Sequence, residues 1–253
     1  MSMEFPHLGI VIDGDGLNNV DQRLYEFKLS NILLLLSTFA VPRAIFRKII
    51  AHGGVEIVPW NTQDAKQFGA CNATGNQPGE DWPEMRAGFF TLPGRATVHY
   101  SPDTWMTGSC ASGPGSKPDE ILLHELVHSA RFTGRDFNQK PLTGPMSGYG
   151  DEEEYFAVLV TNIYTSEAGG TNLRADHAGF SNLSATLSKP EDFLRMPENY
   201  RLVKKFCSQH PNIAPMIATA NAAFNPVKTF YEWKSRNFEP DPVQWVIDQA
   251  LTR

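Results

Sequence analysis

Apolar residues along the chain recur with two periods, and these periods predict short strands and longer helices. Alternating or β-branched runs that end at turn-forming residues are typical of strands. The predicted strands cover residues 8–13, 55–60 and 96–101. Between the last two strands, residues 61–94 are rich in Gly, Asn, Pro and Asp and keep no period, which predicts a long irregular segment.

Helical spacing dominates the rest of the chain. It predicts one helix from Val20 to Ala40, a break at Pro42, and a second helix that starts with that proline, in "PRAIFRKII". Further helices are predicted at residues 116–128, 151–168, 190–208, 212–223 and 241–252. Because strands precede helices and no linker or repeat interrupts the chain, we expect an α+β fold in a single domain, residues 1–253.

Composition and charge narrow the class of protein. Hydrophobic residues make up 41% of the chain and charged residues 20%, which is typical of a soluble globular protein. The formal net charge is −6 and the basic residues are scattered, which argues against nucleic-acid binding. The strongest apolar run, residues 32–41, is too short to span a membrane. Residues 1–13 lack the charged and apolar regions of a secretory signal, so any export is expected to use other machinery.

The three cysteines, Cys71, Cys110 and Cys207, are few and odd in number, which does not describe a disulfide scaffold. The favoured expectation is therefore three unpaired thiols. A single bridge between Cys71 and Cys110 in an oxidising compartment is the alternative.

The segment "ILLHELVHSARF", residues 121–132, holds the strongest chemical signal. On a helix, His124 and His128 lie one turn apart on the same face, so both imidazoles can reach one metal ion. Glu125 sits about 100° round from His124, where it can address a water on the metal without ligating it. The surrounding leucines predict a buried helix, and buried imidazoles need a partner that a zinc ion would supply.

The start of this helix is also marked in the sequence. Ser116 and Asp119 have the spacing of a capping box, and Pro118 is tolerated only in a first helical turn. We therefore expect the two histidines to lie on a well-defined helix rather than in a loop.

A catalytic zinc needs a third protein ligand and an open position for water. Metzincins have a third histidine a few residues after the second one, but residues 129–137 contain none. A carboxylate from a later helix is therefore the expected ligand. Glu154, with Ala157 one turn on, resembles the Glu-x-x-Ala element of gluzincins. Glu153 and Glu152 compete for this role, and Asp151 with Glu154 also has the spacing of a capping box.

The mechanism expected of such a site is hydrolysis by an activated water. Zinc lowers the pKa of its bound water from 15.7 to about 7 and polarises the scissile carbonyl. Glu125 would take the proton of this water and pass it to the leaving amine. A donor must also stabilise the oxyanion, and Tyr149 is the first candidate with His177 as the second.

With these residues in view, the chain resembles the bacterial effector-type zinc metallopeptidases, which include type III secretion effectors and domains attached to type VI secretion spike proteins. The resemblance covers residues 8–168, through "GIVIDGDG", "VHYSPDTW", "LLHELVHS" and "EEEYFAV". It implies a zincin-like fold with a small sheet packed on the active-site helix, and one catalytic Zn²⁺. His124, His128 and Glu154 would bind this ion and Glu125 would be the general base. The helices from about residue 190 to 253 match nothing in the family and are expected to form a C-terminal extension.

The resemblance also implies a function. The protein would be a zinc-dependent endopeptidase, a secreted toxin or effector that acts on a protein or peptide substrate inside another cell. The family implies a cognate immunity protein and a partner in the secretion apparatus as well. The periplasm of a rival bacterium is slightly favoured over a host cytosol, because Cys71 and Cys110 could pair there. The alternative is a docking module whose zinc is purely structural, in which a fourth protein ligand closes the site and Glu125 has no role.

Overall fold

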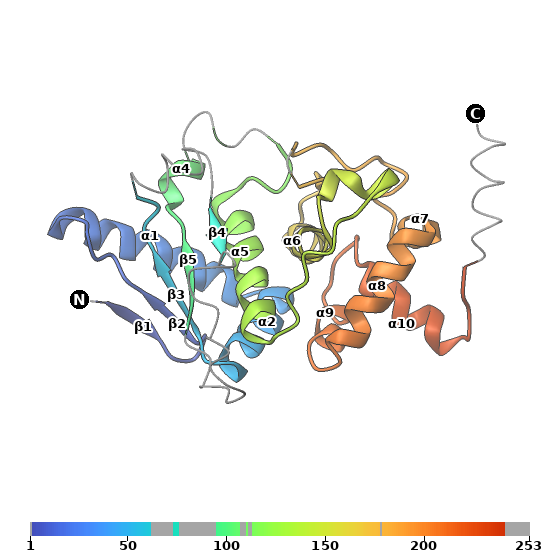
Figure 1. Ribbon diagram of the computed structural model, residues 1–253, viewed down its shortest axis with the longest axis horizontal. Coiled ribbons are helices and arrows are strands. Elements are labelled where there is room, and N and C mark those ends of the chain that lie inside the picture. The colour runs from blue at the N-terminus through green and yellow to red at the C-terminus, as the bar shows by residue number, and fades with distance from the viewer. Residues whose placement is uncertain are drawn as a thin grey trace.

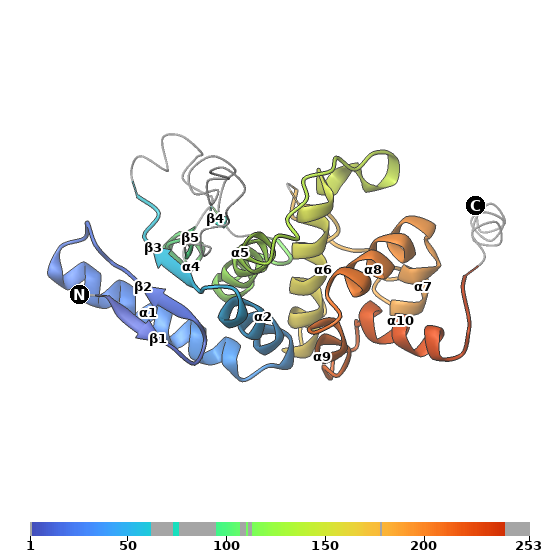
Figure 2. The same ribbon diagram turned by 60° about the horizontal axis from the view of Figure 1, so that its bottom comes forward.

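A five-stranded sheet forms one end of the molecule and a group of helices forms the other (Figure 1). The computed structural model describes residues 2–61, 73–75, 95–106, 110, 113–177 and 179–240. Two long helices, α5 (Pro118–Thr133) and α6 (Glu152–Glu167), lie between these ends, and the same order is visible in Figure 2.

The sheet has the strand order β1-β2-β3-β5-β4. Its strands are β1 (Met3–Phe5), β2 (Ile10–Ile12), β3 (Val55–Val58), β4 (Thr74–Gly75) and β5 (Ala96–His99). The three predicted strands are confirmed as β2, β3 and β5, which are parallel to one another, while β1 and β4 pair antiparallel at the edges. Alternate residues of β3 and β5 are buried, so these strands present one apolar face to the helices.

The first two helices follow β2 directly. Helix α1 (Asn19–Ser37) begins at Asn18, whose side chain accepts hydrogen bonds from the backbone of the first turn. Helix α2 (Ala40–Ala51) begins two residues earlier than predicted, because Pro42 fits into a first turn. The carboxylate of Glu167 accepts the backbone N–H groups of Ala40 and Val41 at 2.8 and 3.0 Å, so the end of α6 caps the start of α2.

Helix α5 is the central element of the fold. It packs against β5 and β4 on one side and against α6 on the other, so nearly all of its residues are buried. The predicted capping box is wrong by one residue: Lys117 is the N-cap, and its backbone N–H donates to Glu120 at 3.1 Å. Ser116 instead donates its hydroxyl to the carbonyl of Gly113. Two short elements, α4 (Pro102–Met106) and the 3₁₀ helix η1 (Gly144–Tyr149), precede α5 and α6 respectively.

The C-terminal helices are α7 (Pro190–Arg195), α8 (Pro197–Gln209), α9 (Ala214–Ala218) and α10 (Pro226–Ser235). Pro197 divides the predicted helix 190–208 into two, and the prediction for 212–223 is confirmed only for the five residues of α9. Helix α10 was not predicted, and the predicted helix 241–252 lies outside the described residues.

One continuous cluster of buried apolar residues runs from Leu8 to Phe230, so the C-terminal helices complete the core around α6. Polar contacts join them as well. The hydroxyl of Tyr155 donates to Asn199 at 3.1 Å, and the backbone N–H of Phe224 donates to Ser166 at 2.9 Å. The α+β class is therefore confirmed for the described part of the chain.

Among the described residues, no single helix has the length and hydropathy of a membrane span. Helices α1 and α2 meet these criteria only when taken together, and they are bent by 110° relative to each other.

The cysteines differ in state. Cys110 is disulfide-bonded, whereas Cys207 is a buried free thiol. Cys71 lies outside the described residues. The expectation of three unpaired thiols is therefore wrong for Cys110.

Candidate metal centre

The packing of α5 against α6 brings three of the predicted metal ligands together. His124 and His128 are buried in the middle of α5, and Glu154 lies in the first turn of α6. Nε2 of His124 lies 3.1 Å from Nε2 of His128 and 3.1 Å from Oε2 of Glu154. Nε2 of His128 lies 3.2 Å from the same oxygen. Two imidazole nitrogens and one carboxylate oxygen thus form a nearly equilateral triangle.

These distances fit a metal ion. Ligands held about 2.1 Å from a tetrahedral zinc lie about 3.4 Å from one another. The observed edges of 3.1 to 3.2 Å are close to that value. Two nitrogens and a carboxylate oxygen are also donors that zinc accepts in catalytic sites. The residues present therefore fit the ion that the sequence predicts.

The three consecutive glutamates have different partners, which separates the alternatives left open by the sequence. Glu152 is fully buried and pairs with Lys205 and with Arg201 at 3.4 Å, on the side of the C-terminal helices. Of the three carboxylates, that of Glu154 lies among the histidine Nε2 atoms. Asp151 is the N-cap of α6, accepting the N–H groups of Glu153 and Glu154, so the helix start does not require the side chain of Glu154.

Glu153 occupies a position behind the triangle. Its Oε1 lies 3.4 Å from Nδ1 of His128, and Nε of Arg131 donates to both of its oxygens at 2.8 and 2.9 Å. A carboxylate that contacts the far nitrogen of a metal-binding histidine fixes the tautomer and the orientation of the ring. Glu153 is therefore placed to position His128 rather than to ligate. For Nδ1 of His124 the described residues provide no such acceptor.

A buried polar network extends this arrangement. Nη1 of Arg131 contacts Nε2 of His210, at the end of α8, and the guanidinium lies 4.5 Å from the ring centre of Phe156. Lys48 of α2 pairs with Asp136 and lies 3.0 Å from Nδ1 of His210. Burial, together with the charges of Lys48 and Arg131, lowers the pKa of His210 to about 2, so this ring is neutral and accepts from Arg131. The orientation of His128 thus depends on several elements of the fold.

The electrostatics of the triangle favour a cation. Burial lowers the pKa of His124 to about 3. His128 is also buried, but the carboxylates around it, Glu154 first, raise its pKa well above the usual value. Burial disfavours the charged form of Glu154, yet His128 and His124 outweigh this effect and hold its pKa far below the usual range. An ionised carboxylate therefore faces a position where positive charge is stabilised.

His177 joins the same group from a loop. Its Nε2 lies 3.2 Å from Oε2 of Glu154, and its ring stacks on His124 with an interplanar angle of 5° and a centroid distance of 5.5 Å. One ligand atom each from His124, Glu154 and His177 lie within 4.8 Å of one another. The sequence offered His177 only as the second candidate for the oxyanion donor, because nothing local marks a histidine in a loop as a metal neighbour.

Arg174, which lies near the metal centre, was not predicted as a site residue from the sequence. This buried arginine donates Nε to the carbonyl of Asp176 at 2.7 Å and Nη2 to the carbonyl of His177. Its guanidinium carbon lies 3.8 Å from the ring centre of Phe180. Burial lowers its pKa to about 10, against the attraction of Glu154, Asp176 and Glu125. No motif surrounds Arg174 in the sequence, so only the fold reveals that it braces the loop of His177.

The two predicted catalytic residues lie in different settings. Glu125 is buried on α5, where it directly follows His124, and its negative charge contributes to the raised pKa of His128. Tyr149 is buried at the end of η1, with its ring 5.0 Å from that of Tyr155. Burial raises the pKa of its phenol well above the usual value. The role of Tyr149 as an oxyanion donor stays a prediction.

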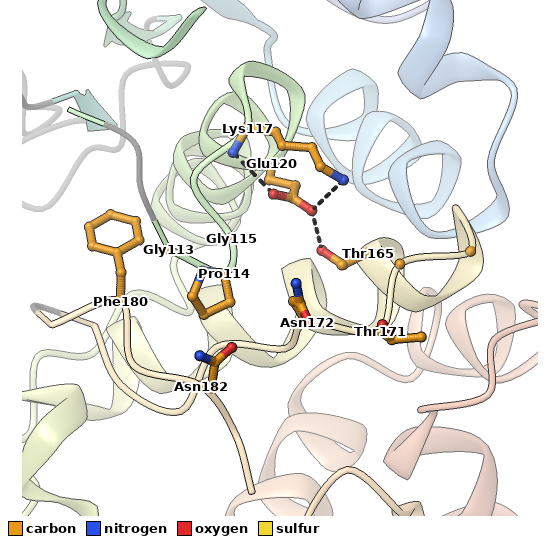
Figure 3. A pocket seen from close by; sticks show the side chains of 12 residues that line it. Gly113, Pro114, Gly115, Lys117, Glu120, Thr165, Thr171, Asn172, Phe180 and Asn182 are labelled. Atoms are coloured by element: carbon orange, nitrogen blue, oxygen red, sulfur yellow. Dashed lines mark hydrogen bonds and ion pairs between the residues drawn. The ribbon is translucent and has the colours of Figure 1, made fainter. Parts of the chain in front are cut away.

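A pocket of roughly 490 Å³ lies beside the N-terminal end of α5 (Figure 3). The carboxylate of Glu120, which lines this pocket, already has partners within the protein: it accepts a hydrogen bond from Thr165 at 2.8 Å and one from the backbone of Lys117. The other side is formed by residues 169–172 and by Phe180 and Asn182, on either side of His177 in the sequence. The loop that carries His177 therefore also borders a pocket.

Comparison of the chain with family models, with curated proteins and with solved structures gives no match.

Proposed function

We propose that this protein is a zinc-dependent endopeptidase with a zincin-like active site. The observation that carries the proposal is the triangle of His124 Nε2, His128 Nε2 and Glu154 Oε2, with edges of 3.1 to 3.2 Å. It is formed by a helix that packs on a small sheet and by the helix next to it. Glu125 lies next to this triangle and is not part of it.

Each residue then has a role. His124, His128 and Glu154 would hold one zinc ion, while Glu153 and Arg131 keep the ring of His128 in place. The bound ion would activate a water molecule and polarise the scissile carbonyl. Glu125 would accept a proton from the attacking water and donate it to the leaving amine.

A second candidate is a docking module whose zinc is structural. The observation that favours it is His177, which lies close enough to Glu154 to be a fourth ligand. A site with four protein ligands is typical of structural zinc. In such a module Glu125 would have no chemical role, so the two proposals differ in the effect of replacing this residue.

The first test is metal binding by the purified protein. We expect one zinc ion per chain and removal by a chelator. Zinc at one hundred times its dissociation constant should stabilise the fold by about 2.7 kcal/mol, or roughly 5–10 °C in melting temperature. Mass spectrometry under native conditions and thermal melts measure both, and His124→Ala serves as the metal-free control. A wild-type chain that binds no zinc would contradict both candidate functions.

We further propose that the protein is a toxin that acts in the periplasm of another bacterium. The disulfide-bonded state of Cys110 supports this compartment, because disulfides persist in oxidising environments. Expression with an added export signal should therefore stop growth, and expression without it should not. Growth curves measure this, with Glu125→Gln as the inactive control. Toxicity confined to the cytosol would contradict the periplasmic proposal.

A further inference from the structure

One member of the candidate metal centre faces solvent. The side chains of His124, His128 and Glu154 are 3%, 7% and 24% exposed, whereas that of His177 is 41% exposed. His177 therefore covers the group from the solvent side. A catalytic zinc keeps its open position on the side from which water and substrate arrive.

His177 reaches this position from the end of a short hairpin. The segments 173–177 and 179–183 run antiparallel, with the N–H of Leu183 donating to Leu173 at 2.7 Å and that of Ala175 donating to Ser181 at 2.8 Å. The base of the hairpin is fixed to α6, because the side-chain amide of Asn162 bonds both backbone groups of Arg174 at 2.8 Å. The hairpin is thus anchored to α6 at its base.

We propose that His177 is a fourth, releasable ligand of the metal, and that it closes the site in the folded protein. This inference rests on the proposed function. Its Nε2 lies 3.2 Å from Oε2 of Glu154, which is the same distance as between that oxygen and Nε2 of His128. With His177 bound, two helices and one hairpin supply four ligands, and the position that a water needs beside Glu125 is occupied.

The contacts of His177 are those of a ligand that can leave. Two hydrogen bonds hold the backbone of His177: its N–H donates to the carbonyl of Gly148 at 2.9 Å, and its carbonyl accepts from Arg174. The chain enters the hairpin from α6 through Gly169, which has a φ of 83° and no neighbouring atom where a Cβ would be. Residues 169–172 border the pocket shown in Figure 3, so this approach to the hairpin has space beside it. An incoming substrate that displaces His177 would open the site without disturbing the buried ligands.

The test compares the wild-type protein with His177→Ala and His177→Asp. The control is His7→Ala, because His7 is exposed in the turn that follows β1. Cobalt(II) replaces zinc as a visible probe, because its absorption reports the number and geometry of the ligands. A competing chelator measures zinc affinity, and a quenched peptide library measures hydrolysis.

We expect His177→Ala to change the cobalt spectrum and to weaken zinc binding. Loss of an outer-shell partner of a metal costs roughly 10- to 100-fold in affinity, and loss of a ligand should cost at least as much. Hydrolysis should rise, because the open position is free. His177→Asp should restore a spectrum typical of four protein ligands, together with the low activity, because a carboxylate can ligate in place of the ring. His7→Ala should change nothing.

Two results would overturn the inference. An unchanged cobalt spectrum and zinc affinity in His177→Ala would show that His177 is not a ligand. Lost hydrolysis in His177→Ala would show that the ring serves the reaction instead of closing the site. If the spectrum and affinity change as expected but neither protein hydrolyses any peptide, His177 is confirmed as a ligand and the proposed peptidase function is wrong.

Discussion

Replacing Glu125 with Gln is expected to reduce peptide hydrolysis by about 10²- to 10⁴-fold while the zinc content stays at one ion per chain. The substitution keeps the size of the side chain and removes only its ability to take up a proton. Glu125 is buried on α5 and stands beside the ligand pair instead of belonging to it. The loss should therefore appear in kcat and not in metal binding.

The matched control is Glu120→Gln. Glu120 is also a buried carboxylate of α5, but it bonds Thr165 and the start of the helix, beside the pocket and not beside the histidines. Its replacement should lower the melting temperature and leave kcat close to wild type. Peptide kinetics with zinc-saturated protein measure both variants. Full activity of Glu125→Gln would mean that the chain is not a peptidase of this kind.

The parts of the site that depend on local periodicity could be predicted from the sequence. Two histidines four residues apart lie on one face of any helix, and the apolar residues around them require burial, so the geometry of His124 and His128 follows from spacing alone. The choice of Glu154 as the third ligand depended only on the resemblance of Glu154 and Ala157 to a Glu-x-x-Ala element. The structure places its carboxylate against both histidines because α5 and α6 pack side by side.

The parts that depend on tertiary packing could not be predicted. His177 and Arg174 lie on a hairpin held by Asn162, and the sequence around them has no period that would reveal it. The contact of Arg131 with His210 joins residues 79 positions apart. Both belong to long-range contacts that a pattern of a few residues does not encode.

The fold shows the same division. The strands and long helices were predicted where apolar residues repeat, but the parallel pairing of β2, β3 and β5 was not, because strand pairing depends on contacts between segments far apart in the sequence. Two differences at helix starts involve proline. Pro42 and Pro197 both lie in first turns, where a missing N–H group costs little, so α2 begins before Pro42 and a new helix begins at Pro197.

The last expected result concerns the three glutamates at the start of α6. Glu154→Ala should abolish zinc binding at neutral pH, because it removes the carboxylate oxygen that lies 3.1 and 3.2 Å from the Nε2 atoms of His124 and His128. Added zinc should then no longer raise the melting temperature, since the binding energy of the metal is part of the stability of the folded state. Chelator competition and thermal melts with and without zinc measure the two effects.

Its neighbours provide the controls, and each should behave differently. Glu153→Gln should weaken zinc binding by about 10- to 100-fold without abolishing it, because it loosens the ring of His128 and leaves Arg131 without a charged partner. Glu152→Gln should keep zinc affinity but lower the melting temperature, because its buried carboxylate pairs with Lys205 and Arg201. If Glu153→Ala empties the site while Glu154→Ala retains zinc, the ligand is Glu153, and α6 must be rotated by about 100° from the arrangement described.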